Sequence, residues 1–465
     1  MINIKWVSCI ALVFCVLFAS TGIRAQEITV FDSIGAGIAL APDGSVWFSP
    51  GFPTRLMRIV GNTVHEIDIF GYYRFELDTP CQIAFAPKGQ MWLEQQAWEV
   101  PPPRSRFYSF DQYQGLSEID INADFWQEES RGGMFFDSEN HYYGIYYRYN
   151  SRSQSSAWGL TPGVNFYRLW RLSHDDSETV WGAMELSRPV FTFGRSAWIG
   201  CYSINIYTGD LYEKGLYRID LETGDELANY TSEDGISDRY SSPRFFDASG
   251  RLWILSHHQI MTFDGNSFDV FEPFAGDELH SDLLAMDANG TIWTSGDQTV
   301  SWYNEGQTGT YAVGDGLPTG EILDCLIDFD GYLWLQHEGG MLARISNGGW
   351  PPMRLRLSKL ETPDSIAVVA NLFNTQPVVG VDVYIACQIG DSLLFYPCWT
   401  PEPSPIQINL YAGFNQTATI ISAPRAHIPP GTYTFYGCMT GRNTGKLIGP
   451  LDRKFEVLTV EVGAD

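Results

Sequence analysis

The side chains of this sequence that could carry out acid–base or metal chemistry are four histidines and two glutamates. Histidine and glutamate serve as general acids and bases, and both bind metal ions. No two of the six share a spacing that forces them together, and neither a His-Glu-x-x-His nor a Gly-x-Ser-x-Gly motif occurs. We therefore predict no catalytic residue, no metal ligand and no cofactor, with a lyase or hydrolase that uses this set as the alternative. The six residues are Glu94, His257, His258, His280, His337 and Glu338.

Aromatic side chains form a second group that could bind a ligand. Aromatic residues make up 14% of the chain, and six of them lie in segments that we predict to connect strands. Flat rings with carboxylates nearby suit the recognition of sugars or peptides, and long loops on a rigid scaffold commonly carry binding sites. The alternative is that these loops pack on one another. The six predicted ligand-binding residues are Tyr72, Tyr73, Trp98, Trp126, Tyr147 and Trp158.

A repeated pattern indicates the elements that hold these residues. A short apolar run, a turn ending mostly in Gly, two residues and an aromatic anchor recur about every 40 to 55 residues, which is close to the period of propeller blades. An apolar strand such as Leu56–Ile59 or Leu342–Ile345 follows each anchor. We therefore predict an all-β fold with a seven-bladed β-propeller over residues 26–350. The seven anchors are Trp47, Trp92, Tyr143, Trp198, Trp253, Trp293 and Trp334.

The predicted strand order within a blade places the six aromatic residues together. Connections between the second and third strands lie on the same face of a propeller as those between the fourth strand and the next blade. We predict long connections of the first kind over residues 95–106, 148–165 and 201–215. The aromatic residues then form a rim on one face, which we call the aromatic rim.

Both ends of the predicted propeller have distinctive features. The seventh blade lacks a fourth strand, whereas the segment Glu27–Asp32 precedes the first blade as a spare one. We predict that this N-terminal strand completes the last blade, because pairing removes a free sheet edge. After residue 350 the pattern changes to short strands. We predict an immunoglobulin-like β-sandwich over residues 351–465, in which Pro429–Tyr433 is typical of the tyrosine corner.

The repeats resemble the two-component regulator propeller family of secreted bacterial β-propellers. The resemblance rests on Asp315-Gly-Leu-Pro318 ahead of Asp328 and Gly331-Tyr-Leu-Trp334, and it covers about residues 26–350. In that family the repeats often form the periplasmic sensory half of hybrid histidine kinases. Because we recognise neither a transmembrane helix after the signal peptide nor a kinase region here, the resemblance implies the propeller and not the signalling role. Pro42-Asp-Gly-Ser-Val-Trp47 is more loosely similar to the repeats of streptogramin (virginiamycin B) lyase.

The N-terminus predicts export. Residues 1–25 read as a signal peptide, with Lys5, the apolar run Val7–Ala19 and a cleavage site after Ala25. The run is too short to span a bilayer, and no lipobox surrounds Cys9 or Cys15. We predict a secreted or periplasmic protein with no membrane span after cleavage. The pairing of the six remaining cysteines is left open.

The charge excludes one class of partner. The chain has a net charge of −26, yet residues from Pro351 onward hold 8 bases and 9 acids, so the excess of acid belongs to the predicted propeller. Such a field repels phosphate backbones, so we predict no nucleic-acid partner. The function predicted is that of an exported binding or scaffold propeller for a small molecule, a glycan or a protein. A sensory partner of a two-component system is a further alternative.

Overall fold

The structure is a computed structural model, and it describes most of the chain between residues 27 and 463. The described residues are 27–31, 35–50, 56–67, 81–86, 89–97, 104–111, 115–119, 134–136, 142–146, 155–160, 167–172, 182–186, 190–191, 196–205, 211–220, 223, 225–236, 241–256, 259–271, 283–296, 298–346, 350–375, 379–450 and 453–463. Within them, the helical turns are the 3-10 segments Ser232–Asp234, Val313–Asp315 and Arg425–His427. The fold is therefore all-β. The predicted signal peptide lies outside the described residues.

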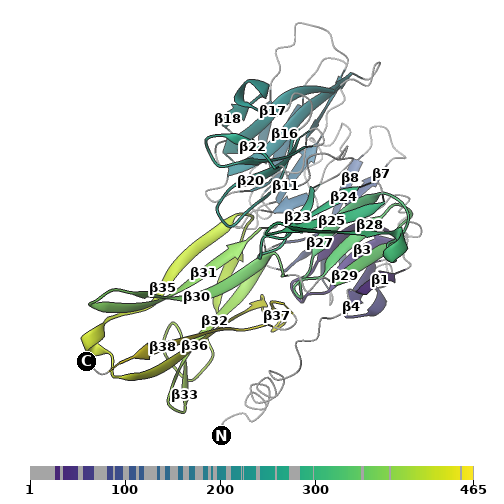
Figure 1. Ribbon diagram of the computed structural model, residues 1–465. Helices are drawn as coiled ribbons and strands as arrows, with labels where there is room; N and C mark the ends of the chain where they lie inside the picture. The colour runs from purple at the N-terminus through teal and green to yellow at the C-terminus, as the bar shows by residue number, and fades with distance from the viewer. Residues whose placement is uncertain are drawn as a thin grey trace.

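The described strands up to residue 346 form seven antiparallel sheets of four or five strands (Figure 1). We number the sheets in chain order. Sheet 1 contains β2 (Gly35–Leu40), β3 (Val46–Pro50), β4 (Leu56–Val60) and β5 (Thr63–Ile67). Sheet 2 contains β6 (Cys81–Phe85), β7 (Met91–Ala97), β8 (Arg104–Asp111) and β9 (Gly115–Ile119). Sheet 3 contains β10 (Met134–Phe136), β11 (Tyr142–Tyr146), β12 (Ser155–Leu160) and β13 (Tyr167–Leu172).

The later sheets follow the same order of strands. Sheet 4 contains β14 (Gly182–Leu186), β15 (Val190–Phe191), β16 (Ser196–Asn205), β17 (Leu211–Asp220) and β18 (Glu226–Tyr230). Sheet 5 contains β19 (Ser241–Phe246), β20 (Leu252–Ser256), β21 (Gln259–Phe263) and β22 (Phe268–Val270). Sheet 6 contains β23 (Leu283–Met286), β24 (Ile292–Gly296), β25 (Thr299–Asn304) and β26 (Gln307–Ala312). Sheet 7 contains β27 (Ile322–Ile327), β28 (Leu333–His337), β29 (Leu342–Ser346) and β1 (Glu27–Phe31).

First strands of consecutive sheets lie side by side. β2 contacts β6, β6 contacts β10, β19 contacts β23, β23 contacts β27, and β27 contacts β2. The sheets are therefore arranged with their first strands inward and their fourth strands outward. This arrangement is propeller-like.

The turn between the first and second strands is built by its aspartate. In sheet 7 one oxygen of Asp328 accepts the backbone N–H groups of Asp330 and Tyr332, and the other accepts the indole N–H of Trp334 at 2.8 Å. Asp247 does the same for Trp253 at 3.1 Å in sheet 5. The glycine of each turn has a positive φ, 85° at Gly331, which a side chain would strain. The Asp-to-Trp spacing of the repeat therefore encodes one hydrogen-bonded unit.

The described anchor tryptophans Trp47, Trp198, Trp253, Trp293 and Trp334 pack between neighbouring sheets, as predicted. An arginine lies over four of them, and in three cases it comes from the third strand. Trp334 is 2% exposed, and the guanidinium of Arg344 lies 5.4 Å from its ring centroid. Arg344 is directly opposite Trp334 across β28 and β29, because the Leu-x-Arg-Ile signature of the third strand is in register with the anchor. Arg58 and Arg218 repeat this geometry at 5.7 Å over Trp47 and Trp198.

The N-terminal strand completes sheet 7, as the sequence predicts. β1 pairs antiparallel with β29 along all five of its residues, from Glu27 opposite Ser346 to Phe31 opposite Leu342. The Phe31 ring stacks on Trp334 with centroids 5.4 Å apart. This pairing joins the two ends of the region and removes an open edge from β29.

The C-terminal module, β30 to β38, consists of two packed sheets. One sheet contains β30 (Met353–Glu361), β31 (Ser365–Asn374) and β35 (Phe414–Pro424). The other contains β32 (Val379–Ile389), β33 (Ser392–Phe395), β34 (Ile406–Leu410), β36 (Gly431–Gly441), β37 (Leu447–Ile448) and β38 (Glu456–Val462). One apolar cluster fills the space between them. The Tyr433 hydroxyl donates to the Pro429 carbonyl at 2.9 Å, the bond expected of a tyrosine corner.

In sheets 2, 3 and 4 the connections between strands differ from the predicted long loops. Residues 95–106 and 201–215 are predicted to be long connections, but β7 extends to Ala97 and β8 begins at Arg104, while β16 and β17 are ten residues each. Residues 148–165 contain β12, so the signature Leu169–Leu172 lies in the fourth strand, β13, and not in the third. Hairpins extended by paired strands replace much of the predicted loops, because cross-strand pairing can continue where the local repeat pattern has ended.

Candidate functional site

One face of the sheets is covered by the C-terminal module. We call it the covered face; it is formed by the turns between the first and second strands. The module contacts these turns in sheets 5, 6, 7 and 1, which are consecutive once sheet 7 meets sheet 1. Figure 1 shows β30, β31 and β35 extending from this end of the sheets. The opposite face, formed by the connections from second to third strands, is the free face.

Main-chain groups make much of this junction. Gly449 N–H donates to the Phe329 carbonyl at 3.0 Å, and Ala288 N–H donates to the Pro351 carbonyl at 3.0 Å. Phe329, at the tip of the sheet 7 turn, is 1% exposed and belongs to the apolar core of the module. A Cβ atom at Gly441 would overlap the carbonyl of Pro42, so the two surfaces fit closely. The module is thus packed against the sheets and not merely tethered to them.

Two ion pairs at Asp330 join the module to the sheets. Lys454 and Lys446 donate to its two carboxylate oxygens at 2.6 and 2.9 Å. Burial alone raises the pKa of Asp330, but the hydrogen bonds and positive charges of the two lysines together lower it below its ordinary value. Asp330 therefore contributes stability as a carboxylate.

We expect Asp330→Asn to lower the free energy of unfolding by about 2 kcal/mol at pH 7, because two charge-assisted hydrogen bonds are weakened. A lowered pKa gives stability that is present above the ordinary value of 3.8 and is lost as the pH falls through the folded value. The difference between the variant and the parent chain should therefore shrink below about pH 4. Urea unfolding at several pH values measures this, with the exposed Asp269→Asn as control. A difference that stays constant down to pH 3 would contradict the assignment.

The free face is the side to which the predicted aromatic rim belongs. Tyr72, Tyr73, Trp98, Trp126 and Tyr147 lie outside the described residues. In the sequence, residue 98 follows the end of β7, and residue 126 comes between β9 and β10, so the aromatic rim stays a prediction. Both strand ends are opposite to the covered face, since consecutive strands run antiparallel.

The position of Trp158 differs from the prediction. It was expected in a connection, but it lies within β12, where its backbone pairs with Gly144 on one side and Leu169 on the other. A residue in the third strand is held by the ladder of the sheet. Trp158 is therefore not a loop residue of the rim.

Four of the first strands contain an irregularity on the side of the free face, near the centre of the sheets. β2, β19, β23 and β27 each contain a one-residue bulge, at Gly37, Arg244, Leu284 and Leu323. Bulges redirect side chains and often lie beside functional sites. Leu323 is 54% exposed although β27 lies between β23 and β2. Its side chain therefore faces the central space around which the first strands are arranged.

Buried polar residues lie beside these bulges, at the ends of the second strands. His337 is 1% exposed and is opposite Ile322, next to the bulge at Leu323. Its Nδ1 is 3.4 Å from the Gly320 carbonyl, and its Nε2 has no hydrogen-bond partner among the described residues. The neighbouring Gln336 accepts the N–H of Gly37 from sheet 1 at 2.9 Å. Burial lowers the pKa of His337 despite the Gly320 contact, so its imidazole is neutral at pH 7. We call the group formed by Gln336, His337 and the four bulge residues the axial mouth.

Of the other acid–base candidates, Glu338 alone has a described side chain; it directly follows His337 and is exposed, whereas His337 is buried. His257, His258 and His280 lie outside it, and of Glu94 only the backbone position in β7 is described. Among the described residues no group of three His, Cys, Asp or Glu side chains could hold a metal ion. Among the described residues, Cys387, Cys398 and Cys438 form no disulfide. Sequence reasoning listed His337 but missed the bulges, which no residue type in the repeat signals.

The fold and the two faces define a class: an all-β protein of propeller-like sheets, closed on one face by a second module. No helix in the described ranges combines the length and apolarity needed to cross a membrane. No protein-family model matches the chain, and no curated protein matches it.

Solved structures with similar folds include the following three. The virginiamycin B lyase of Staphylococcus aureus is 10% identical, with 69% of this chain and 99% of that chain covered and a TM-score of 0.46. YCF48 from Cyanidioschyzon merolae is 10% identical, with coverages of 69% and 98% and a TM-score of 0.47. The extracellular domain of a hybrid two-component system of B. thetaiotaomicron is 12% identical, with coverages of 91% and 77% and a TM-score of 0.27. Both classes that the repeats resemble are therefore among the matches.

Proposed function

We propose that this protein is an exported binding protein, a seven-bladed β-propeller over residues 26–350 whose free face takes up a carbohydrate ligand. The observation that carries the proposal is the position of the C-terminal module. It packs on the covered face of four sheets, so a ligand has access from the free face. The aromatic rim and the axial mouth both belong to that face.

The chemistry of the free face suits a sugar. Aromatic rings stack on the apolar faces of sugar rings, and the residues proposed for this are Tyr72, Tyr73, Trp98, Trp126 and Tyr147. A neutral imidazole can donate or accept one hydrogen bond, but His337 is 1% exposed and its Nε2 is buried, so we do not propose it as a ligand contact. Export follows from the signal peptide proposed for residues 1–25, and the net charge of −26 disfavours polyanionic partners.

The C-terminal module, residues 351–465, is proposed to be immunoglobulin-like. Its support is the pair of packed sheets and the Tyr433 bond to Pro429. The module has little net charge of its own and places lysines against an acidic turn. Its role in the proposal is to hold the covered face, so that the ring keeps a fixed free face.

A titration of the full mature chain with cello-, xylo-, chito- and galacturono-oligosaccharides, followed by tryptophan fluorescence, tests the proposal. We expect at least one saturable ligand whose affinity falls about tenfold or more in the Trp98→Ala, Trp126→Ala double variant, because each stacked ring contributes about 1 kcal/mol. The matched control is Trp399→Ala in the module, which should bind as the parent chain does.

Two outcomes would count against this proposal. If the double variant keeps its melting temperature and its full affinity, the aromatic rim is not the site. Failure to bind any of the four classes would remove the carbohydrate assignment.

A further inference from the structure

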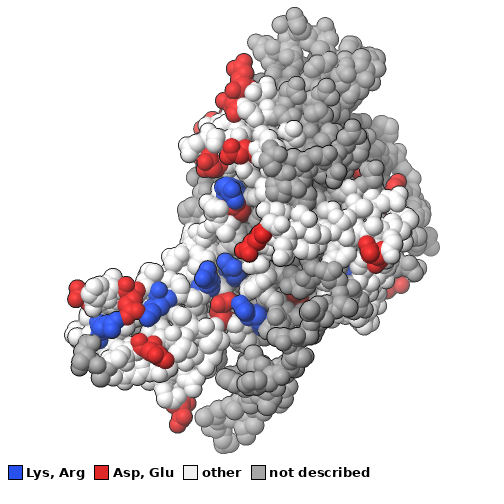
Figure 2. Space-filling view, viewed as in Figure 1, with Lys and Arg blue, Asp and Glu red and all other residues white. Residues whose placement is uncertain are grey.

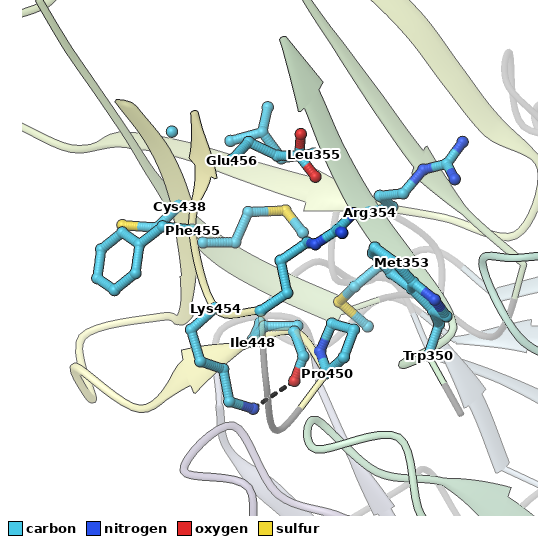
Figure 3. Close-up of a pocket in the computed structure, with 14 residues that line it drawn as sticks. Trp350, Met353, Arg354, Leu355, Cys438, Ile448, Pro450, Lys454, Phe455 and Glu456 are labelled. Carbon is cyan, nitrogen blue, oxygen red and sulfur yellow. Dashed lines mark hydrogen bonds between the residues drawn. The ribbon is translucent and has the colours of Figure 1, made fainter. Parts of the chain in front are cut away.

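A pocket lies where the linker after sheet 7 enters the C-terminal module (Figure 3). Its volume is about 290 Å³ with the open mouth included. Trp350 of the linker, Arg354 of β30, and Arg453, Lys454 and Glu456 near the start of β38 line it together with apolar side chains. Figure 3 shows Trp350 and Arg354 beside Met353, with Glu456 on the far side of the pocket. The pocket belongs to neither the free face nor the aromatic rim.

Two guanidinium groups flank Trp350 without a carboxylate partner. The Cζ atoms of Arg354 and Arg453 lie 5.9 and 5.8 Å from the centroid of its ring. No ion pair joins either arginine to an acid among the described residues, although the chain has 55 acidic residues for 29 basic ones. The Nε of Arg354 is buried and has no hydrogen-bond acceptor there. Both arginines therefore line the pocket and contact Trp350 without an ion pair to an acid among the described residues.

The neighbouring charges leave the two arginines in excess. Lys454 is occupied by Asp330 and by the Gly449 carbonyl, the dashed bond in Figure 3. Asp287 accepts N–H groups from Asn289, Thr291 and Trp350, so its oxygens are largely used within its own turn. Among the described residues that line the pocket, Glu456 is the one acid, and burial raises its pKa even though Arg453, Arg354 and Arg356 lower it.

We propose that this pocket binds a small oxyanion, a carboxylate, phosphate or sulfate group, between Arg354 and Arg453. A planar guanidinium presents two parallel N–H donors to such a group, and two guanidiniums on one indole are already held in place for it. Because Trp350 also donates to Asp287 of sheet 6, anion binding tightens the contact of the module with the sheets.

The experiment is calorimetric titration of the full mature chain with citrate, phosphate, sulfate and galacturonate at constant ionic strength. We expect one site per chain for at least one of the four, and a dissociation constant at least tenfold higher in the Arg354→Gln, Arg453→Gln double variant. The melting temperature of the parent chain should rise with the same anion and not with chloride. Lys359→Gln, a basic residue of β30 remote from the pocket, is the matched control and should leave binding unchanged.

The outcomes separate the sources of the anion. Binding of galacturonate without citrate or phosphate assigns the site to an acidic sugar, whereas binding of phosphate or sulfate assigns it to an inorganic anion. If the double variant does not fold, Arg453→Gln alone is used, because Arg453 is exposed and its loss leaves no buried gap. No saturable binding of any probe up to about 10 mM, or equal binding in the variants, overturns the proposal. Galacturonate binding belongs to this pocket if the Arg354→Gln, Arg453→Gln variant weakens it and the Trp98→Ala, Trp126→Ala variant does not, which distinguishes it from binding on the free face.

Discussion

Removal of residues 26–34 is expected to lower the free energy of unfolding of the mature chain by more than about 5 kcal/mol. Phe31 alone is a buried aromatic residue stacked on Trp334, and loss of such a side chain costs about 3–5 kcal/mol. The deletion also removes the five-residue pairing with β29 and exposes its edge. Arg344 loses contacts as well, since its guanidinium lies 5.8 Å from the Phe31 ring and near Thr29.

Urea unfolding of the truncated and full mature chains measures this effect. The control is removal of residues 463–465, which lie beyond the last strand and should leave the unfolding midpoint unchanged within error. Phe31→Ala provides an intermediate case that keeps the backbone pairing. If the two truncations are equally mild, β1 does not hold the ends of the region together, and the pairing with β29 is dispensable.

Trp334→Ala and Trp253→Ala are each expected to cost about 3–5 kcal/mol, because a buried aromatic side chain leaves a cavity when it is truncated. Trp334 is 2% exposed and Trp253 is 3% exposed. Each also donates to the aspartate of its turn, so truncation leaves a buried carboxylate with one donor fewer. We expect both variants to unfold at clearly lower urea concentrations than the parent chain.

Trp302→Ala is the matched control for this series. It replaces the same residue type on β25, directly opposite the anchor Trp293, but Trp302 is only partly buried. Its cost should be well below that of the two anchors. Trp334→Phe is an intermediate case at the anchor, since it keeps one aromatic ring but removes the indole N–H and part of the ring volume. Equal costs for Trp302 and the anchors would mean that the spacing of the repeat does not identify the core.

Sequence reasoning was reliable where the signal is local. Asp328, Gly331 and Trp334 lie within seven residues, and the turn they form depends on bonds among themselves. The spare strand before the first repeat was predicted correctly for a related reason, because an unpaired strand edge must find a partner. The tyrosine corner is equally local, since Tyr433 bonds a carbonyl four residues earlier.

Sequence reasoning failed where pairing is decided across strands. The prediction placed Trp158 in a loop, whereas β12 pairs on both sides and holds it within sheet 3. It recognised the Leu-x-Arg-Ile signature but gave its arginine no role, because the stacking of Arg344 on Trp334 exists only once β29 is in register with β28. The bulges at Arg244 and Leu323 are likewise absent from the repeat pattern, as a bulge is a property of two paired strands.

The sequence by itself determined the all-β fold, the spacing of turns and anchors, and the acidic character of the part before Pro351, since these depend on composition and on contacts within a few residues. The tertiary structure alone decided which face is available. The bonds of Thr375 to the Met286 carbonyl and of Lys454 to Asp330 join residues 89 and 124 positions apart. Such contacts form only after both modules have folded, because they depend on the matching of two surfaces and not on any local pattern.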